Sequence, residues 1–238
     1  RAPGPNLGLY DVRRMPQPLA MTLADGSSHQ NPAVFWNGRF SEPGYAYGEH
    51  TNDFLREQAA VLPSGQALCL AEGEGRNAVH LAQLGHLVVA QDLSSVGLAK
   101  ARQLADRRGV AIETLCCDVA VWEPEPESFD LVVAIWMHLP PQLRASVHQQ
   151  AVAALRPGGI LILEAYTPRQ LELGTGGPPV VELLVEPADL RQELAGLEML
   201  HLEETRRLIH EGDYHQGESA VVQAVGRKPM PIAKQLQN

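Results

Sequence analysis

Residues 67–82, which read ALCLAEGEGRNAVHLA, decide the fold of this chain. The apolar run 67–71 has the length and composition of a buried parallel strand, and Glu72 and the turn Gly73-Glu74-Gly75 follow it. Glycines at this point let the backbone turn tightly and approach a ligand closely. The helix that begins after them directs its first N–H groups at negative charge. The stretch therefore predicts the unit at which α/β sheets bind nucleotide-like ligands, with an ordinary glycine-rich βα turn as the alternative.

Composition and charge narrow the class of protein. The 238 residues favour one domain, and 45% hydrophobic with 20% charged residues is typical of a soluble globular chain. The net charge of −9 argues against a nucleic-acid backbone as the main partner. No run approaches the roughly 18 apolar residues of a membrane helix, and no leader pattern opens the chain. Three cysteines are too few for a disulfide framework. We expect a cytoplasmic monomer or homodimer with a small-molecule partner, no nucleic acid and no membrane.

The chain divides into three segments. Residues 1–33 are rich in proline and glycine and predict an irregular N-terminal arm, residues 34–227 form the domain, and residues 228–238 form a tail. Half of the Phe, Trp and Tyr residues lie between Phe35 and Phe54. In a chain with 5% aromatic residues this concentration predicts a cap or a pocket wall. Each ring taken singly is equally well explained as an anchor that holds the arm on the core.

The remaining pattern predicts a doubly wound sheet. Strands that are apolar on both faces and joined by helices form parallel sheets. A polar turn at 210–217, between two long alternating segments, predicts an antiparallel hairpin. The predicted fold is α/β, a doubly wound, mostly parallel, seven-stranded, Rossmann-like sheet with an antiparallel C-terminal hairpin at its edge. We expect helices over 52–62, 76–84, 96–108, 141–155 and 186–194, parallel strands over 67–71, 87–91, 111–117, 129–135 and 160–164, and hairpin strands over 197–209 and 219–225.

Acidic residues end three successive predicted strands: Glu72, Asp92 and Asp118. Ligands of open α/β sheets bind along the edge where the parallel strands end. Asp92 lies twenty residues after Glu72, the spacing at which a carboxylate accepts charge-assisted hydrogen bonds from ribose hydroxyls. Helix capping explains one such acid, since Asp is common at these positions. Three in succession point to a ligand with a ribose and further hydrogen-bond donors.

Two cofactor classes compete for this edge. Residues 73–78 fit G-x-G-x-x-A, which favours NAD or NADP and an oxidoreductase. Glu72, however, places a carboxylate where a pyrophosphate would be repelled, and Asp118 has no role in that fingerprint. Both acids suit S-adenosylmethionine, which has an amino-acid end, a ribose, an adenine amine and a positive sulfonium. A binding-only or regulatory module that keeps the cofactor pocket without turnover is a further alternative.

Residues 35–225 resemble the class I S-adenosylmethionine-dependent methyltransferases. The resemblance lies in LAEGEGRN at 70–77, the strand that ends in Asp92, Cys117-Asp118-Val119, FDLV at 129–132 and LRPGG at 155–159. WNGRF at 36–40, the pattern from Tyr45 to Phe54, GTGGP at 174–178 and EGDYHQG at 211–217 are similar to the tellurite-resistance and thiopurine-type branch. This resemblance implies methyl transfer from S-adenosylmethionine to a small-molecule nucleophile, such as a thiol or a chalcogen oxyanion. The transfer is by direct displacement, and S-adenosylhomocysteine is the product.

The resemblance implies a role for each cofactor residue. Gly73 and Gly75 hold the methionine part with Glu72 near its ammonium, and Asp92 holds the ribose. Around the adenine, Asp118 accepts from the amine while Leu93 and Val119 pack on the ring. The cofactor's carboxylate is expected to meet the arm residues Arg39 and Tyr47, with Arg76 as a rival, and Ile135 completes the cofactor contacts.

The acceptor side is less specific. Residues 136–140 follow the fourth strand, where this fold faces its substrate, and His138 is the candidate general base because an imidazole titrates near neutral pH. A structural histidine is the alternative, since displacement by an anionic nucleophile needs little base. Metal-ligand spacing is missing, so no metal site is expected. The candidate substrate contacts are Trp36, Tyr45, Trp136, Tyr166, Arg169 and His215.

Overall fold

The computed structural model describes residues 31–231, and a seven-stranded sheet is its centre. The strand order is β3-β2-β1-β4-β5-β7-β6, in which β1 to β5 are parallel and β7 runs antiparallel to both of its neighbours. The predicted fold class is thereby confirmed. The strands are β1 (Gln66–Leu70), β2 (Leu87–Asp92), β3 (Glu113–Cys116), β4 (Phe129–Ile135), β5 (Leu155–Tyr166), β6 (Glu198–Glu211) and β7 (His215–Arg227).

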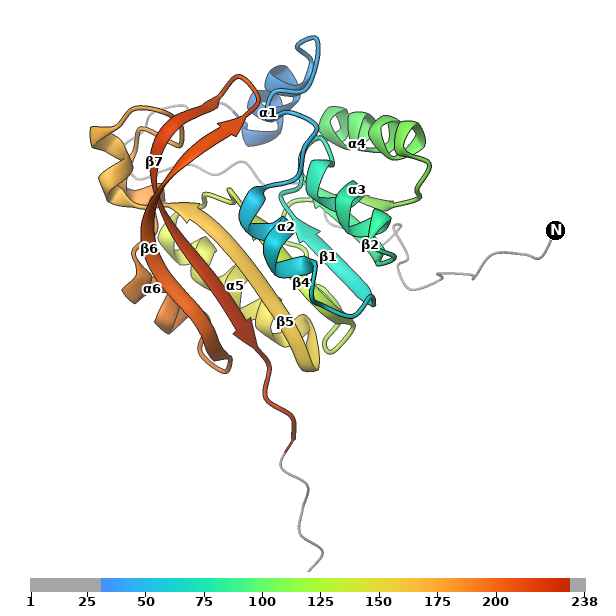
Figure 1. Ribbon diagram of the computed structural model, residues 1–238, viewed down its shortest axis with the longest axis vertical. Helices are drawn as coiled ribbons and strands as arrows, with labels where there is room; N and C mark the ends of the chain where they lie inside the picture. Colours follow the sequence, from blue (N-terminus) through green and yellow to red (C-terminus); the bar gives the residue numbers. More distant parts are fainter. Residues whose placement is uncertain (1–30, 232–238) are drawn as a thin grey trace, which may run out of the picture.

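Helices cover both faces of the sheet (Figure 1). On one face, α2, α3 and α4 pack on alternate strand residues such as Ala67, Cys69 and Val133. On the other face, α5 and α6 pack on the residues between them, such as Leu68 and Val132. Both sets are buried, which explains why the strands read as continuous apolar runs. The helices are α1 (Pro32–Phe40), α2 (Asp53–Ala59), α3 (Arg76–Gln83), α4 (Ser95–Arg108), α5 (Pro141–Ala154) and α6 (Pro187–Glu193), with 3₁₀ turns η2 (Pro168–Glu172) and η3 (Val181–Leu183).

Local signals fix the helix ends near the site. The side chain of Asn52 caps α2 by accepting the N–H of Leu55 at 3.0 Å, and Ser94 caps α4 by accepting the N–H of Gly97 at 3.0 Å. Gly109 ends α4 in the left-handed conformation, which glycine adopts without strain. These caps set where α2 and α4 begin, and both begin at the edge where the parallel strands end.

Three elements differ from the sequence prediction. The aromatic segment 32–40 forms the helix α1, with Asn31 as its cap and Pro32 at its first position. Strand β5 begins at Leu155 rather than at 160, because Leu155 already pairs with Phe129 of β4, and residues 156–159 form an irregularity before regular pairing resumes at Ile160. The hairpin strands extend to Glu211 and from His215, which leaves a turn of only three residues, 212–214. His215 therefore stands at the start of β7 and not in the turn.

The predicted segments at the two ends of the chain lie mostly outside the described residues. Of the predicted arm, residues 1–30 fall outside, and Pro32 already belongs to α1. Of the predicted tail, residues 232–238 fall outside, and 228–231 follow β7 without regular structure. Within residues 31–231, the longest helices are too short and too polar to cross a membrane.

Candidate functional site

The acidic residues that end successive strands meet at one edge of the sheet. Glu72 follows β1, Asp92 ends β2 and Asp118 follows β3, and these strands are neighbours in the sheet. Helix α1 and the tip of the β6–β7 hairpin lie over the same edge (Figure 1). The sequence thus places its acids, its aromatic segment and its hairpin turn around a single site.

Glu72 closes the N-terminus of α3. Its Oε1 accepts the N–H groups of Asn77 at 2.9 Å and Ala78 at 2.8 Å. Glu72 thus caps the helix, because the residue at the cap position, Gly75, has no side chain to do so. Burial raises the pKa of Glu72 to about 7, against the opposing effect of these donors and of Arg76. Near neutral pH the carboxyl is therefore balanced between its two forms, and a cation placed against it would draw it to the ionised form.

Asp92 is held by the backbone beneath α1. Its Oδ2 accepts the N–H of Gly73 at 2.8 Å and its Oδ1 accepts the N–H of Ser94 at 2.7 Å. Phe40 covers this turn, since a β-carbon at Gly73 would stand 3.0 Å from the ring. Each carboxylate oxygen keeps a second lone pair that can accept from a hydroxyl. Asp92 is therefore oriented and still able to bind a ribose, with Phe40 at the entrance.

The two glycines of the turn have different roles. Gly73 has φ +64° and faces Phe40 at the site. Gly75 has φ +91°, and a β-carbon there would stand 2.5 Å from the β-carbon of Ala101 in α4. The missing side chain of Gly75 therefore serves the close approach of α3 and α4, and the expected cofactor contact of Gly75 would be made by its backbone.

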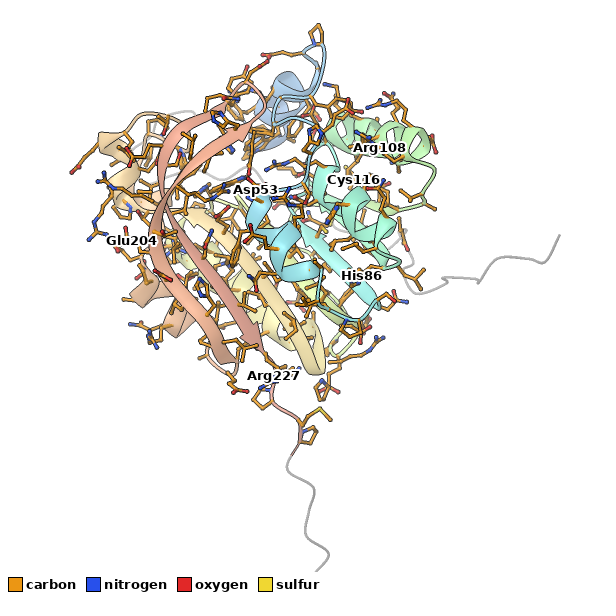
Figure 2. The ribbon with its side chains drawn as sticks, viewed as in Figure 1. Asp53, His86, Arg108, Cys116, Glu204 and Arg227 are labelled. Carbon is orange, nitrogen blue, oxygen red and sulfur yellow. The ribbon has the colours of Figure 1, made fainter. Side chains whose placement is uncertain are left out.

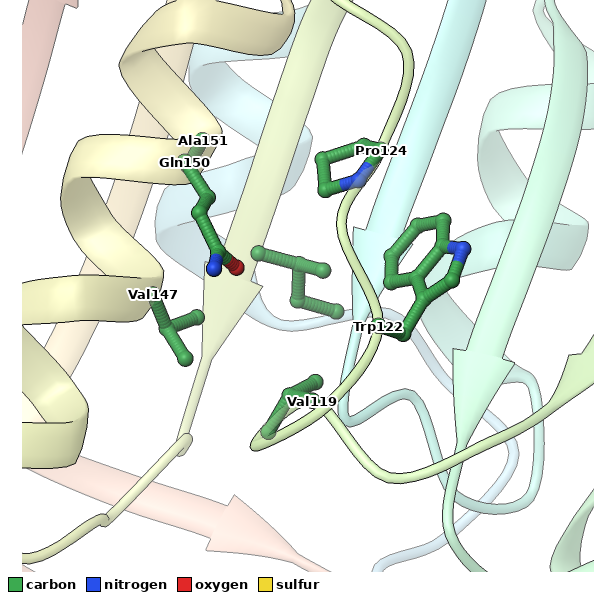
Figure 3. A pocket seen from close by; sticks show the side chains of 7 residues that line it. Val119, Trp122, Pro124, Val147, Gln150 and Ala151 are labelled. Carbon is green, nitrogen blue, oxygen red and sulfur yellow. The ribbon is translucent and has the colours of Figure 1, made fainter. Parts of the chain in front are cut away.

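Asp118 and Val119 follow β3, and Val119 lines a small pocket at the same edge. Oδ1 of Asp118 accepts the N–H of Ala120 at 2.9 Å, and Asp118 is only half-buried. Val119 packs on the core and faces the narrow hollow drawn in Figure 3, which has a volume of about 10 Å³. Leu93 is half-buried after β2, and Ile135 is buried at the end of β4. The pocket is lined by Leu70, Val119, Trp122, Pro124, Val147, Gln150 and Ala151.

Arg39 and Tyr47 come together, as the sequence analysis requires for a shared role. Nη1 of Arg39 donates to the Tyr47 hydroxyl at 3.3 Å, and the guanidinium lies 3.7 Å from the centre of the Tyr214 ring. Trp36 is 6.5 Å from Tyr47 between ring centres. Helix α1, the 44–48 turn and the hairpin tip therefore share one aromatic cluster.

A compartment of aromatic rings lies behind this cluster. Trp136 stacks on Tyr166 with ring centres 4.4 Å apart, and His215 meets both rings edge-on at 5.2 and 5.3 Å. Trp136 has φ +59°, a conformation that costs a non-glycine residue roughly 1–3 kcal/mol. Its Nε1 donates to Glu211 at 2.6 Å, which holds the indole in place. We call Trp136, Tyr166, His215 and Glu211 the aromatic compartment.

Two backbone contacts close the aromatic compartment. The hairpin tip docks on the 44–48 turn, where the N–H of Asp213 donates to Ala46 at 3.0 Å. The start of β7 docks on the glycine-rich loop 174–177, where the N–H of Gln216 donates to Thr175 at 3.0 Å. As a result Tyr166 is fully buried and His215 is 6% exposed.

His138, the predicted base, lies behind the aromatic compartment. Its Nδ1 is 3.0 Å from the carbonyl oxygen of Leu183 and is placed to donate to it, and its ring stacks on the far side of the cluster at 5.7 Å from Tyr166. Burial lowers the pKa of His138 to about 4. An imidazole with this pKa is a weak proton acceptor near neutral pH. The geometry favours the structural alternative for His138.

Two predicted substrate residues lie away from the aromatic compartment. The Tyr45 hydroxyl donates to the carbonyl of Lys100 at 3.0 Å, so this ring packs on α4. Arg169 is exposed and pairs with Glu204, which is labelled on the outer strand β6 in Figure 2. Both residues have local partners, and the structure does not bring them to the other candidates.

A buried ionic network beneath the aromatic compartment was missed by the sequence analysis. Arg76 pairs with Glu211 at 2.6 Å, and Arg207 pairs with Glu164 at 2.6 Å and with Glu211 at 3.3 Å. Asn52 bridges the two carboxylates, donating to Glu164 at 2.6 Å and to Glu211 at 2.9 Å. Arg76, the predicted rival for the cofactor carboxylate, is thereby already paired. The concentration of charged residues in the predicted strand, where 203–211 read EETRRLIHE, was the available signal.

The residues at the edge fit S-adenosylmethionine chemically. Glu72 has one oxygen free of the two helix N–H groups and a pKa that responds to a cation. Asp92 keeps lone pairs for hydroxyls, and Asp118 precedes Val119, which lines the small apolar pocket. Arg39 and Tyr47 form a donor pair near the end of this row. Acids, apolar surface and a donor pair match the ammonium, ribose, adenine and carboxylate of that molecule.

Comparisons with known proteins agree with this geometry. Residues 67–159 match the family model described as "Methyltransferase domain". The chain is 36% identical over 101 residues to the tRNA 5-carboxymethoxyuridine methyltransferase of Escherichia coli (strain K12), covering 40% of this chain and 37% of that protein. It is 30% identical over 115 residues to the N-terminal Xaa-Pro-Lys N-methyltransferase 1 of Rattus norvegicus, covering 47% and 52%. The chain thus spans about a third to a half of the length of these curated relatives.

Solved structures show the same fold. TehB from Haemophilus influenzae superposes with a TM-score of 0.61 at 19% identity, covering 75% of this chain and 62% of that one. Magnesium protoporphyrin IX methyltransferase from Synechocystis PCC 6803, with bound SAH, gives a TM-score of 0.60 at 17% identity, covering 83% and 97%. Residues 67–159 of this chain thus match a methyltransferase domain, and the described chain has the fold of the solved methyltransferases. The nicotinamide alternative is set aside by this match.

Proposed function

We propose that this protein transfers the methyl group of S-adenosylmethionine to a small-molecule nucleophile, such as a thiol or a chalcogen oxyanion, by direct displacement. The observation that carries the proposal is the closed aromatic compartment. Tyr166, Glu211 and His215 are each at most 7% exposed under the hairpin tip and the 174–177 loop. A compartment closed in this way suits a small acceptor better than a polynucleotide or a protein chain, although both curated relatives are named for macromolecular acceptors.

The residues of the chain would contribute binding, orientation and exclusion of water. When bound, the cofactor supplies a methyl group on a positive sulfur. Glu72 holds the ammonium, Asp92 the ribose and Asp118 the adenine amine, while Arg39 and Tyr47 meet the carboxylate. The ring of Trp136 follows β4 directly and faces the acceptor. Alignment and desolvation of the nucleophile supply most of the rate enhancement in such a site.

The test combines binding with product detection. Isothermal titration is expected to show micromolar-range binding of S-adenosylmethionine and S-adenosylhomocysteine. Transfer from methyl-labelled donor is then measured to thiols, tellurite, halides, phenols and amines, and in parallel to total tRNA and to a Xaa-Pro-Lys peptide. Label in one of the small molecules supports the proposal. Label confined to tRNA or peptide overturns the acceptor class, and binding of the donor without transfer to any acceptor favours a regulatory module.

A further inference from the structure

The last strand of the sheet, β6, has an open outer side. Within residues 31–231 it is hydrogen-bonded to β7 alone, and it stands at the end of the strand order. Its pairing with β7 is regular from His201 to Glu211, with a register shift only before His201. Proteins normally protect such an edge with a proline, lysines, a bulge or a short strand. Because β6 has 14 residues and contains neither proline nor lysine, its outer side can pair with another strand.

The sequence of this strand is complementary to itself in the antiparallel direction. Residues 202–208 read LEETRRL, with Thr205 at the centre. Antiparallel pairing of two copies about Thr205 places Glu204 opposite Arg206 and Leu202 opposite Leu208, twice each because a two-fold axis relates the copies. Opposite charges and apolar pairs that face each other across two strands stabilise the pairing. The segment therefore fits a second copy of itself.

The side chains that this pairing needs are accessible. Leu208 is 62% exposed, and the side chain of Arg206 is 51% exposed with a contact of 4.0 Å to Glu218. Glu204, labelled at the outer side of the molecule in Figure 2, pairs with the exposed Arg169. Since side chains alternate between the two faces of a strand, residues 202, 204, 206 and 208 share one face. The leucine and ion pairs would therefore form one continuous row.

We propose that this protein forms a two-fold symmetric dimer in which the β6 strands of two copies pair antiparallel about Thr205. The two seven-stranded sheets then become one continuous sheet. One face of the joint carries two ion pairs flanked by two leucine pairs, and the backbones of residues 202–208 add about one hydrogen bond per residue pair. Arg207, on the other face, keeps its buried partners Glu164 and Glu211 within its own chain. The inference concerns the assembly of the chain and goes beyond the proposed function.

Charge selects this arrangement over its alternatives. A parallel pair in register would set each glutamate against the same glutamate and each arginine against the same arginine. A shift of the antiparallel centre by one residue would place Glu204 opposite Glu204, or Arg206 opposite Arg206. Like charges directly opposite each other are destabilising, and the net charge of −9 opposes unspecific contact between two copies. The register about Thr205 avoids these repulsions.

The first experiment is sedimentation velocity of the 238-residue protein across micromolar concentrations. A species with twice the mass of the chain is expected. Arg206→Glu places like charges at two positions of the joint and should raise the dissociation constant of the dimer by at least about 10-fold. Arg108→Glu, the same change on the exposed end of α4 (Figure 2), is the matched control and should leave it unchanged. A monomer at all concentrations, or equal effects of the two variants, overturns the inference.

A mixture of two variants separates pairing from general effects on the fold. Arg206→Glu has two acidic side chains in the row, and Glu204→Arg has two basic ones, so each variant alone should dimerise poorly. One copy of each restores opposite charges at both positions, and the mixture should form a dimer with an affinity close to that of the unmodified protein. Melting temperatures show that both variants are folded. Failure of the folded variants to form this mixed dimer overturns the proposed pairing.

Disulfide formation at the centre tests the register. The background is Cys116→Ser, because Cys116 is exposed. Thr205→Cys brings two thiols to the two-fold axis with Cα atoms roughly 4.5–5.5 Å apart, within the range of a disulfide. Glu203→Cys is the control on the same strand, because its two copies would lie about 14 Å apart, four residues at ~3.4 Å each. Oxidation should cross-link Thr205→Cys and spare Glu203→Cys, and equal cross-linking of both, or of neither, overturns the register.

Discussion

Replacing Glu72 by glutamine tests the electrostatics of the donor site. Burial raises the pKa of Glu72 from 4.5 to about 7. Between these two pH values the carboxyl of Glu72 is therefore protonated in the folded chain and ionised in the unfolded chain. The free energy of unfolding contributed by Glu72 therefore falls as pH rises from about 4.5 to about 7, and it is level above that. A glutamine retains an oxygen that accepts the N–H groups of Asn77 and Ala78, and it carries no charge at any pH.

The size of the effect follows from the shift. A difference of 2.5 pKa units corresponds to about 3 kcal/mol at 1.36 kcal/mol per unit. Glu72 keeps some contact with solvent, which screens part of the charge, so we expect Glu72→Gln to be more stable by about 2 kcal/mol at pH 8. For a domain of this length, 2 kcal/mol raises Tm by roughly 4–8 °C. At pH 4.5 the two proteins should melt together.

The assay is thermal unfolding from pH 4.5 to 8, with Glu57→Gln as control because Glu57 is exposed on α2. The same Glu72→Gln protein should bind S-adenosylmethionine more weakly at pH 8, since the ammonium loses its anionic partner. In the unmodified protein this binding should strengthen as pH rises through 7, because the bound cation favours the ionised carboxyl. The reasoning would be refuted if the Tm of Glu72→Gln changed with pH in the same way as that of the unmodified protein. A lower Tm for the variant at pH 8 would also refute it.

Three further predictions test the edge, the network and the hairpin. Asp92→Ala should weaken S-adenosylmethionine binding by at least about 10-fold in isothermal titration, since charge-assisted bonds of ~1.5–3 kcal/mol are lost; unchanged affinity would contradict the ribose role. Arg207→Met should lower the free energy of unfolding by about 3–5 kcal/mol in urea titration, because a carboxylate stays buried without its cation, whereas the exposed Arg206→Met should change it by less than about 0.5 kcal/mol. Gly212→Ala, whose β-carbon would clash with the carbonyl oxygen of Ala46 in the 44–48 turn, should open the hairpin and increase tryptophan quenching by acrylamide. Gly109→Ala has a similar φ in open space and should leave quenching unchanged.

The parallel half of the fold is predictable because its signals are local. Each strand from β1 to β4 reads as an apolar run followed by a turn or cap, and its boundaries in the structure lie within about two residues of the prediction. Helix α1 was missed because its rings and glycine give no helical period, and its stability comes from contacts such as Phe40 on the turn at Gly73. The predicted start of strand β5 was too late, because a proline–glycine segment normally marks a turn, whereas here it is an irregularity within the strand between Leu155 and Ile160.

The donor side of the site is also predictable, for a related reason. Each acid ends its own strand, and the sheet order alone brings Glu72, Asp92 and Asp118 together. What the sequence did not reveal is how they are held. Glu72 caps α3 and Asp92 holds the turn at Gly73, and both contacts depend on how the turn folds. A glycine in a motif does not by itself identify a ligand contact. At position 75 a glycine is required by the packing of α3 on α4, and a bound ligand would require a glycine there as well.

The acceptor side was less predictable because its partners are distant in the chain. Asn52 reaches Glu164 across 112 positions and Glu211 across 159, and no pattern in a single sequence pairs such residues. The same network joins the two halves of the site, since Asn77 at the start of α3 accepts the backbone N–H of Asn52 at 3.0 Å. A ligand that reorders the start of α3 therefore acts on the carboxylate that faces His215. We therefore expect the donor to bind at successive strand ends, which a single sequence reveals, and the acceptor to bind beside a buried network that joins residues distant in the chain.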